Sequence, residues 1–285
     1  MCPFLQKTKA GLHFFHSFLN GSSPFFSKTL GPLSKKKSYP LFIFTFSLAA
    51  ILALSYLALM PDISRLKKEN PAKTAFMKYR ETQWREKGRQ VQVHQAWVPL
   101  SRISPYLVKA VLIAEDDKFW SHEGFDYEGI KQAVEKDLQS GRLKFGGSTI
   151  SQQLARNLYL SPAKSFWRKI REVLITWRME QVLSKKRILE LYLNVAEWGD
   201  GIFGAEAASR HYFEKPASEL SPREAARLAV VLPSPRKLDP AGTQRYVESR
   251  AEVIYSIMQK RGIVPPEFEE DLQPPEKEES PLVQP

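Results

Sequence analysis

The sequence predicts a mostly α-helical domain over residues 90–263. Apolar residues recur there at helical spacing, few segments alternate as strands do, and several helix-start signals are explicit. The chain has 285 residues, of which 43% are hydrophobic, so it is long enough for one or two domains with a buried core.

The first expected helix follows Ser104-Pro105, which has the form of an N-cap and a first-turn proline. Apolar residues then keep helical spacing as far as Glu115: Leu107, Val108, Val111 and Leu112. The stretch from Thr149 to Gln152 has the form of a capping box and predicts a helix over 150–160.

The longest periodic stretch runs from 165 to 195. One apolar stripe within it consists of Trp167, Ile170, Leu174 and Trp177. Another helix is expected after Ser221-Pro222, with its inward face formed by Ala225, Leu228, Ala229 and Leu232.

Residues 40–60 contain no charged side chain, and about 20 apolar residues suffice for a helix to cross a bilayer. We expect a retained transmembrane anchor, because the run is long for a signal peptide and no small-residue cleavage site follows it. Lys35, Lys36 and Lys37 precede this run, and basic residues also follow it, so the Lys/Arg asymmetry is weak; we expect a cytoplasmic N-terminus for residues 1–39 and an exported C-terminal domain. Residues 61–89 are expected to form a connector, and the Pro- and Glu-rich tail 264–285 to be disordered.

The formal net charge is +11, which suggests a polyanionic partner such as nucleic acid, acidic lipid or a phosphate-bearing substrate. The single cysteine, Cys2, excludes an intrachain disulfide and a cysteine-based metal cluster. Three histidines, His94, His122 and His211, show no paired zinc-ligand spacing.

The acidic cluster Glu115, Asp116 and Asp117 directly follows the first expected helix. A solvated turn is the ordinary interpretation of three adjacent acids. Glu115, however, keeps the phase of the apolar stripe, and aromatic residues follow it. A carboxylate in a partly apolar cleft has a raised pKa and can act as a base.

The segment KFGGSTISQQLARN places two glycines before an expected helix start, which is a ready anion site. A simple turn and cap explains the segment equally well. Cations recur beyond it, and a pyrophosphate would fit them: Arg156, Lys164, Arg168, Lys169 and Arg171. Glu172 follows Arg168 by four residues, as in a surface ion pair worth about 0.3–0.5 kcal/mol. Alternatively, the Glu172 carboxylate is held among phosphate-binding cations and binds a divalent metal ion.

Five ordered stretches together resemble the peptidoglycan glycosyltransferases of family 51, and more closely their monofunctional biosynthetic type. They are AEDDKFWSHEGFD, GGSTISQQLARNL, RKIREVLITWRME, KKRILELYLN and REAARLAVVLPSP. The run EWGDGIFGAEAASRHYF is similar to the monofunctional type in particular. The resemblance covers roughly residues 90–240.

The resemblance implies a lysozyme-like fold with a small membrane-associated jaw subdomain, preceded here by the transmembrane helix. It implies an inverting enzyme without a transpeptidase domain, located in the bacterial inner membrane with its catalytic domain in the periplasm. Its substrates would be lipid II and the growing glycan strand, and its product, besides the strand, undecaprenyl pyrophosphate. Implied partners are membrane lipid and other cell-wall synthesis or division proteins, not nucleic acid; Mg²⁺ or Mn²⁺ remains open as a cofactor.

Residue by residue, the resemblance makes Glu115 the base that deprotonates the acceptor sugar's 4-hydroxyl, and Glu172 a supporting second carboxylate. Three cations match positions near the pyrophosphate: Arg156, Lys164 and Arg171. Further substrate-binding positions are Ser148, Thr149, Gln152, Gln153, Asp116, Phe119 and His122. Arg156 and Arg171 stand where lysine is frequent, Ser151 where threonine is common, and Glu214 where glycine often follows Tyr-Phe.

Three other interpretations remain. A lysozyme-like hydrolase needs a protonated glutamic acid and an attacking water, but neither a pyrophosphate-binding patch nor an anchor. A non-catalytic cell-wall scaffold would not require both Glu115 and Glu172. A nucleic-acid-binding protein would explain the charge but not the apolar run.

Overall fold

The computed structural model describes residues 38–58, 60–140, 147–162 and 165–264. The chain divides into two compact units, Met1–Met60 and Pro61–Pro285. In the first unit, helix α2 (Ser38–Ala58) carries apolar side chains that are exposed, among them Phe42, Phe44 and Phe46. No helix within the described part of the chain is long and apolar enough to cross a membrane.

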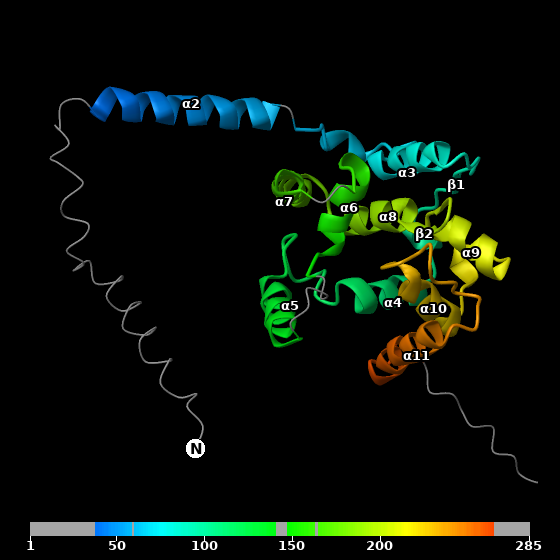
Figure 1. Ribbon diagram of the computed structural model, residues 1–285. Helices are drawn as coiled ribbons and strands as arrows, with labels where there is room; N and C mark the ends of the chain where they lie inside the picture. Colours follow the sequence, from blue (N-terminus) through cyan, green and yellow to red (C-terminus); the bar gives the residue numbers. More distant parts are fainter. Residues whose placement is uncertain (1–37, 59, 141–146, 163–164, 265–285) are drawn as a thin grey trace, which may run out of the picture. The chain divides into compact units, whose positions relative to one another are not determined.

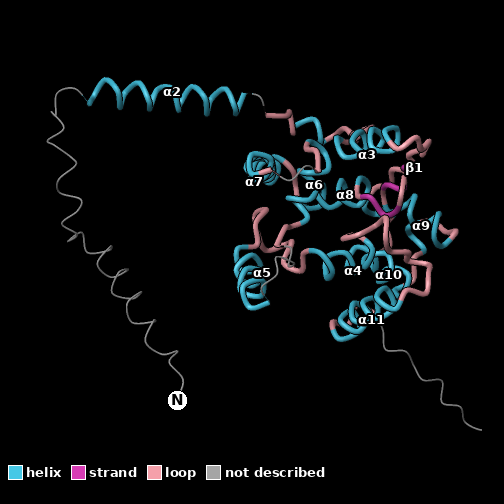
Figure 2. Tube along the Cα trace, viewed as in Figure 1, coloured by secondary structure: helices cyan, strands magenta, loops and turns pink. Residues whose placement is uncertain are grey.

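The second unit is mostly helical, as the sequence predicts (Figures 1 and 2). Its helices are α3 (Ala75–Glu86), α4 (Pro105–Glu115), α5 (Tyr127–Ser140), α6 (Ile150–Tyr159), α7 (Phe166–Val182), α8 (Lys185–Val195), α9 (Ala205–Phe213), α10 (Pro222–Val231) and α11 (Arg245–Lys260). Short 3₁₀ turns add η1 (Ser64–Lys67), η2 (Leu100–Arg102) and η3 (Ala217–Glu219).

A small sheet completes this unit, with strand order β1 (His94–Gln95), β3 (Ile202–Phe203), β2 (Glu197–Gly199). Strand β1 pairs with β3 in parallel, His94 opposite Ile202, whereas β2 pairs antiparallel with an irregular register between Glu197 and Gly199. The strands are short, which explains why no clear alternation marks them in the sequence.

Two helix groups form the core of the second unit. The α4 group consists of α4, α10 and α11, which pack on one another. The α6 group consists of α6 with α3, α7 and α8 around it. Glu115 is the last residue of α4, so the catalytic residue implied by the sequence stands at the end of one group, beside the other.

Helix α3 lies in the segment that the sequence assigns to the connector. It packs against α6, and its Met77 and Trp84 are buried in a cluster with Phe203 of β3. Earlier in the same segment, Ile63 and Leu66 are also buried. The packed part of the second unit therefore begins well before residue 90.

Local signals predict several helix boundaries correctly. The capping box of Thr149 and Gln152 opens α6, and Ser221 and Glu224 form another at α10. Ser104 stands before α4 as expected, but its hydroxyl donates to the Leu220 carbonyl oxygen at 2.9 Å and not to its own helix. That bond ties the start of α4 to the segment before α10.

The stretch 165–195 forms two helices, because Ser184 caps a new helix by accepting a hydrogen bond from the Arg187 amide. The expected apolar stripe of α7 does not face the core. Trp167 and Trp177 are exposed, and the buried face consists of Glu172, Ile175, Thr176 and Met179. Glu214, at a position where related sequences are expected to have glycine, ends α9 in the left-handed region with φ 58°.

Candidate active site

The acidic cluster after α4 separates into three different environments. Glu115 is half-buried, Asp116 is buried, and Asp117 is exposed. Only Asp117 matches the solvated turn of the ordinary interpretation, and it forms a two-bond ion pair with Arg261 at 2.5 and 2.9 Å. The Arg261 hydrogen bonds hold the pKa of Asp117 below its usual value.

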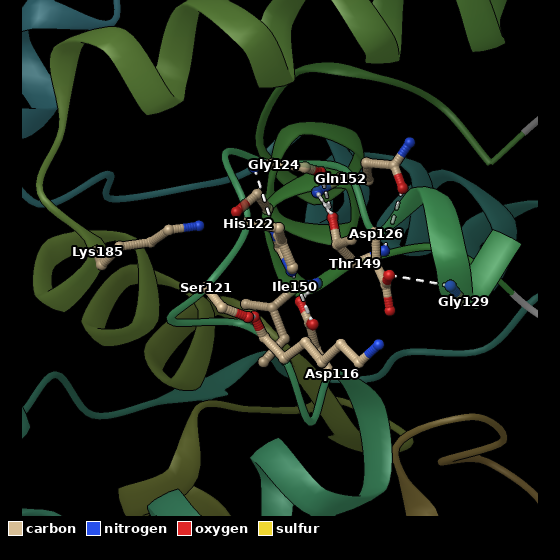
Figure 3. A network of polar contacts seen from close by, with 12 residues as sticks. Asp116, Ser121, His122, Gly124, Asp126, Gly129, Thr149, Ile150, Gln152 and Lys185 are labelled. Atoms are coloured by element: carbon tan, nitrogen blue, oxygen red, sulfur yellow. Dashed lines mark hydrogen bonds and ion pairs between the residues drawn. The ribbon is translucent and has the colours of Figure 1, made fainter.

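Asp116 joins the two helix groups. Its Oδ2 accepts a hydrogen bond at 2.9 Å from the Ile150 amide, in the first turn of α6, and its Oδ1 lies 2.9 Å from His122 Nε2 (Figure 3). The Gly124 amide donates to His122 Nδ1, so the ring proton sits on Nε2 and points at Asp116. The start of α6 thus already holds an anion, the Asp116 carboxylate, where the sequence allowed a bound pyrophosphate.

The loop that carries His122 is fixed by further contacts. Thr149 donates its hydroxyl to the Gly124 carbonyl oxygen at 2.7 Å. Phe119 is fully buried, packs edge-on against His122, and lies under Lys185 with the ammonium 4.6 Å from the ring centre. Of the predicted substrate-binding residues, Asp116, Phe119, Thr149 and Gln152 therefore build the loop and the cap.

Glu115 faces a cavity of about 400 Å³, which we call the carboxylate cavity. It is lined by Ile113, Ala114, Glu115, Asp116, Asp117, Asp126, Gly129, Gln132, Gly147, Ser148 and Thr149. Glu115 Oε2 accepts a 2.7 Å hydrogen bond from Gln153 Nε2, and Gln153 Oε1 accepts one at 3.1 Å from the Tyr192 hydroxyl. The bond between Glu115 and Gln153 crosses from the α4 group to the α6 group.

Burial raises the pKa of Glu115 above its ordinary value, and this effect outweighs the Gln153 hydrogen bond and the charge of Arg156, both of which lower it. Such a carboxylate is a stronger base than an exposed one once it is ionised. The end of α4 therefore carries a half-buried base that opens into a polar cavity.

A second cavity, of about 270 Å³, is lined by Gln153, the hydrogen-bond partner of Glu115. We call it the arginine cavity, because Arg80, Arg156 and Arg168 line it together with Phe76, Gln153, Asn157, Pro162, Tyr192, Ala196, Glu197, Leu232, Pro233 and Pro235. Arg80 is engaged by Glu197 at 2.7 Å and Arg168 by Glu172 at 2.5 Å. Arg156 is half-buried and adds a further positive charge to this cavity.

Glu172 is only 1% exposed and holds two cations, Arg168 and Lys169, each at 2.5 Å. Its burial rules out the weak surface ion pair that the sequence allowed. Lys169 Nζ also lies 3.4 Å from the Ser148 hydroxyl, which lines the carboxylate cavity. Glu172 thus positions one cation toward each cavity.

Glu172 does not fit the role of a metal ligand. Its two carboxylate oxygens are each occupied by a cation, so a divalent ion there would have to displace Arg168 or Lys169. Within the described residues, no group of three or more His, Cys, Asp and Glu side chains could hold a metal ion.

The other predicted cations are placed differently. Arg171 is exposed on α7, next to buried Glu172, and the described residues that line the arginine cavity do not include it. Lys164 lies outside the described residues, as do 1–37 of the N-terminal segment and 265–285 of the tail.

Sequence reasoning did not assign roles to Arg80 or Tyr192. Tyr192 lies inside the matched stretch KKRILELYLN, but nothing local marks its hydroxyl as part of the site. Arg80 comes from α3, outside the matched stretches, and only the packing of α3 on α6 brings it to the arginine cavity.

Comparison with known proteins agrees with this geometry. Residues 81–259 match the family model described as transglycosylase. A biosynthetic peptidoglycan transglycosylase of Azoarcus sp. (strain BH72) is 53% identical over 190 residues, covering 67% of this chain and 82% of that protein. One of the same name from Laribacter hongkongensis (strain HLHK9) is 48% identical over 212 residues, covering 74% and 93%. The matched region contains Glu115, Gln153, Glu172 and Tyr192, and the chain belongs to the transglycosylase family.

Proposed function

We propose that the chain is a monofunctional peptidoglycan glycosyltransferase that polymerises lipid II into β-1,4-linked glycan strands and releases undecaprenyl pyrophosphate. The observation that carries this proposal is a half-buried carboxylate, Glu115, that lines a polar cavity and is hydrogen-bonded to Gln153, a residue of the cavity lined by arginines. The relatives' shared name, biosynthetic peptidoglycan transglycosylase, supports the same activity.

In the proposed reaction Glu115, once ionised, takes the proton of the acceptor sugar's 4-hydroxyl in the carboxylate cavity. The hydroxyl oxygen forms a bond to the anomeric carbon of the donor on the opposite side from the leaving group, with inversion. The bond from that carbon to the pyrophosphate oxygen breaks, and the pyrophosphate keeps the electron pair. Arg156 and Arg168 in the arginine cavity stabilise the growing negative charge.

We propose that the activity takes place at the exported face of the bacterial inner membrane. Residues 40–60, a segment without charge that includes residue 59 outside the described part, would be the anchor. Exposed apolar side chains on α5 and α7 would form the membrane-associated jaw: Tyr127, Val134, Leu138, Phe166, Trp167 and Trp177. Tryptophan and tyrosine favour the membrane–water interface.

Glu115→Gln tests the proposal, because the amide keeps the shape of the side chain but cannot accept the proton. We expect glycan synthesis from lipid II in detergent to be lost, while thermal unfolding of the full chain stays close to wild type. Glu123→Gln, at an exposed position in the same loop, is the matched control and should polymerise normally. Near-normal synthesis by Glu115→Gln contradicts the assignment, and cleavage of finished glycan by the wild type would identify a hydrolase instead.

A further inference from the structure

A chain of two hydrogen bonds runs from the core of the second unit to Glu115. Tyr192 of α8 is 1% exposed, and its hydroxyl donates to Gln153 Oε1 at 3.1 Å. Gln153 Nε2 donates to Glu115 Oε2 at 2.7 Å. The three residues come from α8, α6 and α4, so the chain spans both helix groups.

The Tyr192 hydroxyl determines which way the Gln153 amide points. Among the described residues, Gln153 is the hydrogen-bond partner of this buried hydroxyl. If the amide were turned over, its Nε2 would face the hydroxyl, and the hydroxyl proton would be left without an acceptor in a buried place. Leaving a buried donor unpaired is unfavourable, which favours the orientation with Nε2 toward Glu115.

That orientation favours the ionised form of Glu115. An amide N–H can donate to a carboxylate oxygen, whereas a reversed amide would present Oε1 and require Glu115 to carry a proton. Burial raises the pKa of Tyr192 well above that of a free tyrosine, so its hydroxyl keeps the proton that it donates.

We infer that Tyr192 is a positioning residue: through Gln153 it holds Glu115 Oε2 in a hydrogen bond and leaves Oε1 as the atom that takes the acceptor hydroxyl proton. This inference rests on the proposed function and deepens it. The proton passes from the 4-hydroxyl to Oε1, the hydroxyl oxygen bonds to the anomeric carbon, and the pyrophosphate leaves with the electron pair.

Several other charged groups act on Glu115 and must stay constant in the test. Arg156 of α6 and Arg250 of α11 favour the ionised form, and neighbouring Asp116 opposes it. Asp117 and Asp126 line the same cavity. Tyr192→Phe changes none of these charges, so a change in the titration of Glu115 can be assigned to the lost hydroxyl.

The experiment is the pH dependence of kcat/KM for lipid II polymerisation by full-length wild type and Tyr192→Phe. The acidic limb of kcat/KM reports the base of the free enzyme. Without the hydroxyl the amide can turn over, so the limb should move to higher pH by about one unit. Below the limb the variant should be about tenfold slower, and above the limb its rate should approach wild type. An unmoved limb, or an equal loss at every pH, overturns the inference.

Two further variants protect the test against simple misfolding. Gln153→Met breaks the same chain at the amide and should move the limb in the same direction. The double variant Tyr192→Phe with Gln153→Met should move it no further than Gln153→Met alone, because Tyr192 acts through Gln153. Additive shifts, or no shift in either folded variant, contradict the inference.

Tyr212→Phe is the matched control. Tyr212 is half-buried, and its hydroxyl donates to the Trp198 carbonyl oxygen at 3.3 Å and not to Gln153. Its limb should match wild type. A carbon-13 carboxyl titration of Glu115 in detergent gives the same midpoint without any turnover. A shift of that midpoint in an enzyme that does not polymerise lipid II would refute the proposed function and support the positioning role. An active enzyme without the shift would do the reverse.

Discussion

The sequence resemblance assigns both Arg156 and Arg171 to positions near the pyrophosphate, but the two side chains lie in different surroundings in the structure. Arg156 is half-buried and lines the arginine cavity, whereas Arg171 is exposed on α7. We expect Arg156→Ala to reduce polymerisation at limiting lipid II about tenfold to a hundredfold, because hydrogen bonds to charged groups are worth about 1.5–3 kcal/mol. Arg171→Ala should have a much smaller effect. Initial rates of both variants at equal lipid II concentration check this, and equal losses would contradict the placement.

At the residue scale, the sequence identifies the candidate base but not the residues that form hydrogen bonds with it. The end of α4 was expected to carry a base because Glu115 follows an apolar stripe. Its partners could not be predicted, because Gln153 lies 38 residues away and Tyr192 a further 39 beyond Gln153. Contacts over such separations depend on how helices pack, which periodicity does not encode.

Among the elements, the loop between α4 and α5 depends on one glycine. Gly124 has φ 90°, and a Cβ there would lie 2.9 Å from Glu180 Cγ and 3.0 Å from Thr176 Cγ2. Gly124→Ala combines left-handed strain with overpacking against α7, and we expect it to lower the free energy of unfolding by about 2–5 kcal/mol. Chemical denaturation of the full chain in detergent provides the measurement.

Gly88→Ala is the matched control for Gly124→Ala. Gly88 also has positive φ, 66°, but a Cβ there meets no atom within 4 Å. Strain alone should cost about 1–2 kcal/mol. If the two substitutions destabilise the chain equally, the close approach of the loop to α7 is not what requires glycine at position 124.

At the element scale, caps were predictable and burial was not. A capping box involves residues three apart, so Thr149 and Gln152 mark the start of α6 in the sequence itself. The apolar residues of α7 lie on one face of the helix, as their spacing predicts, but periodicity does not say what that face contacts. Trp167 is 74% exposed, while Glu172 on another face is buried with its two cations.

For the whole molecule, the two compact units predict where the chain can be cut. Deleting residues 1–60 should leave a second unit that unfolds cooperatively and polymerises lipid II in detergent. From intact bilayers it should work poorly, because the proposed tether supplies a high local concentration. Deleting 1–89 removes Met77 and Trp84 from the core, and loss of such buried side chains costs about 2–5 kcal/mol each. Thermal unfolding should then show no cooperative transition, and a cooperative transition would mean that α3 is dispensable.

The extent of the second unit could not be predicted from the sequence for a physical reason. Residues 61–89 are polar and basic, which is typical of a connector, and only two of the residues that α3 contributes, Met77 and Trp84, are buried. A helix that buries so few residues shows weak periodicity. The mostly helical fold class was predictable because it depends on apolar periodicity in several long segments and not on any single segment.

Gln153 lines the arginine cavity and donates a hydrogen bond to Glu115, which lines the carboxylate cavity, so events in the two cavities are linked through one amide. Among the groups that act on Glu115, the Gln153 hydrogen bond is the first of those that lower its pKa. A ligand in the arginine cavity that draws the amide hydrogen to itself takes away a bond that lowers the pKa of Glu115, so its binding is coupled to proton uptake at the other cavity. Thermodynamic linkage makes the coupling reciprocal, so that ligand would bind more tightly in acid.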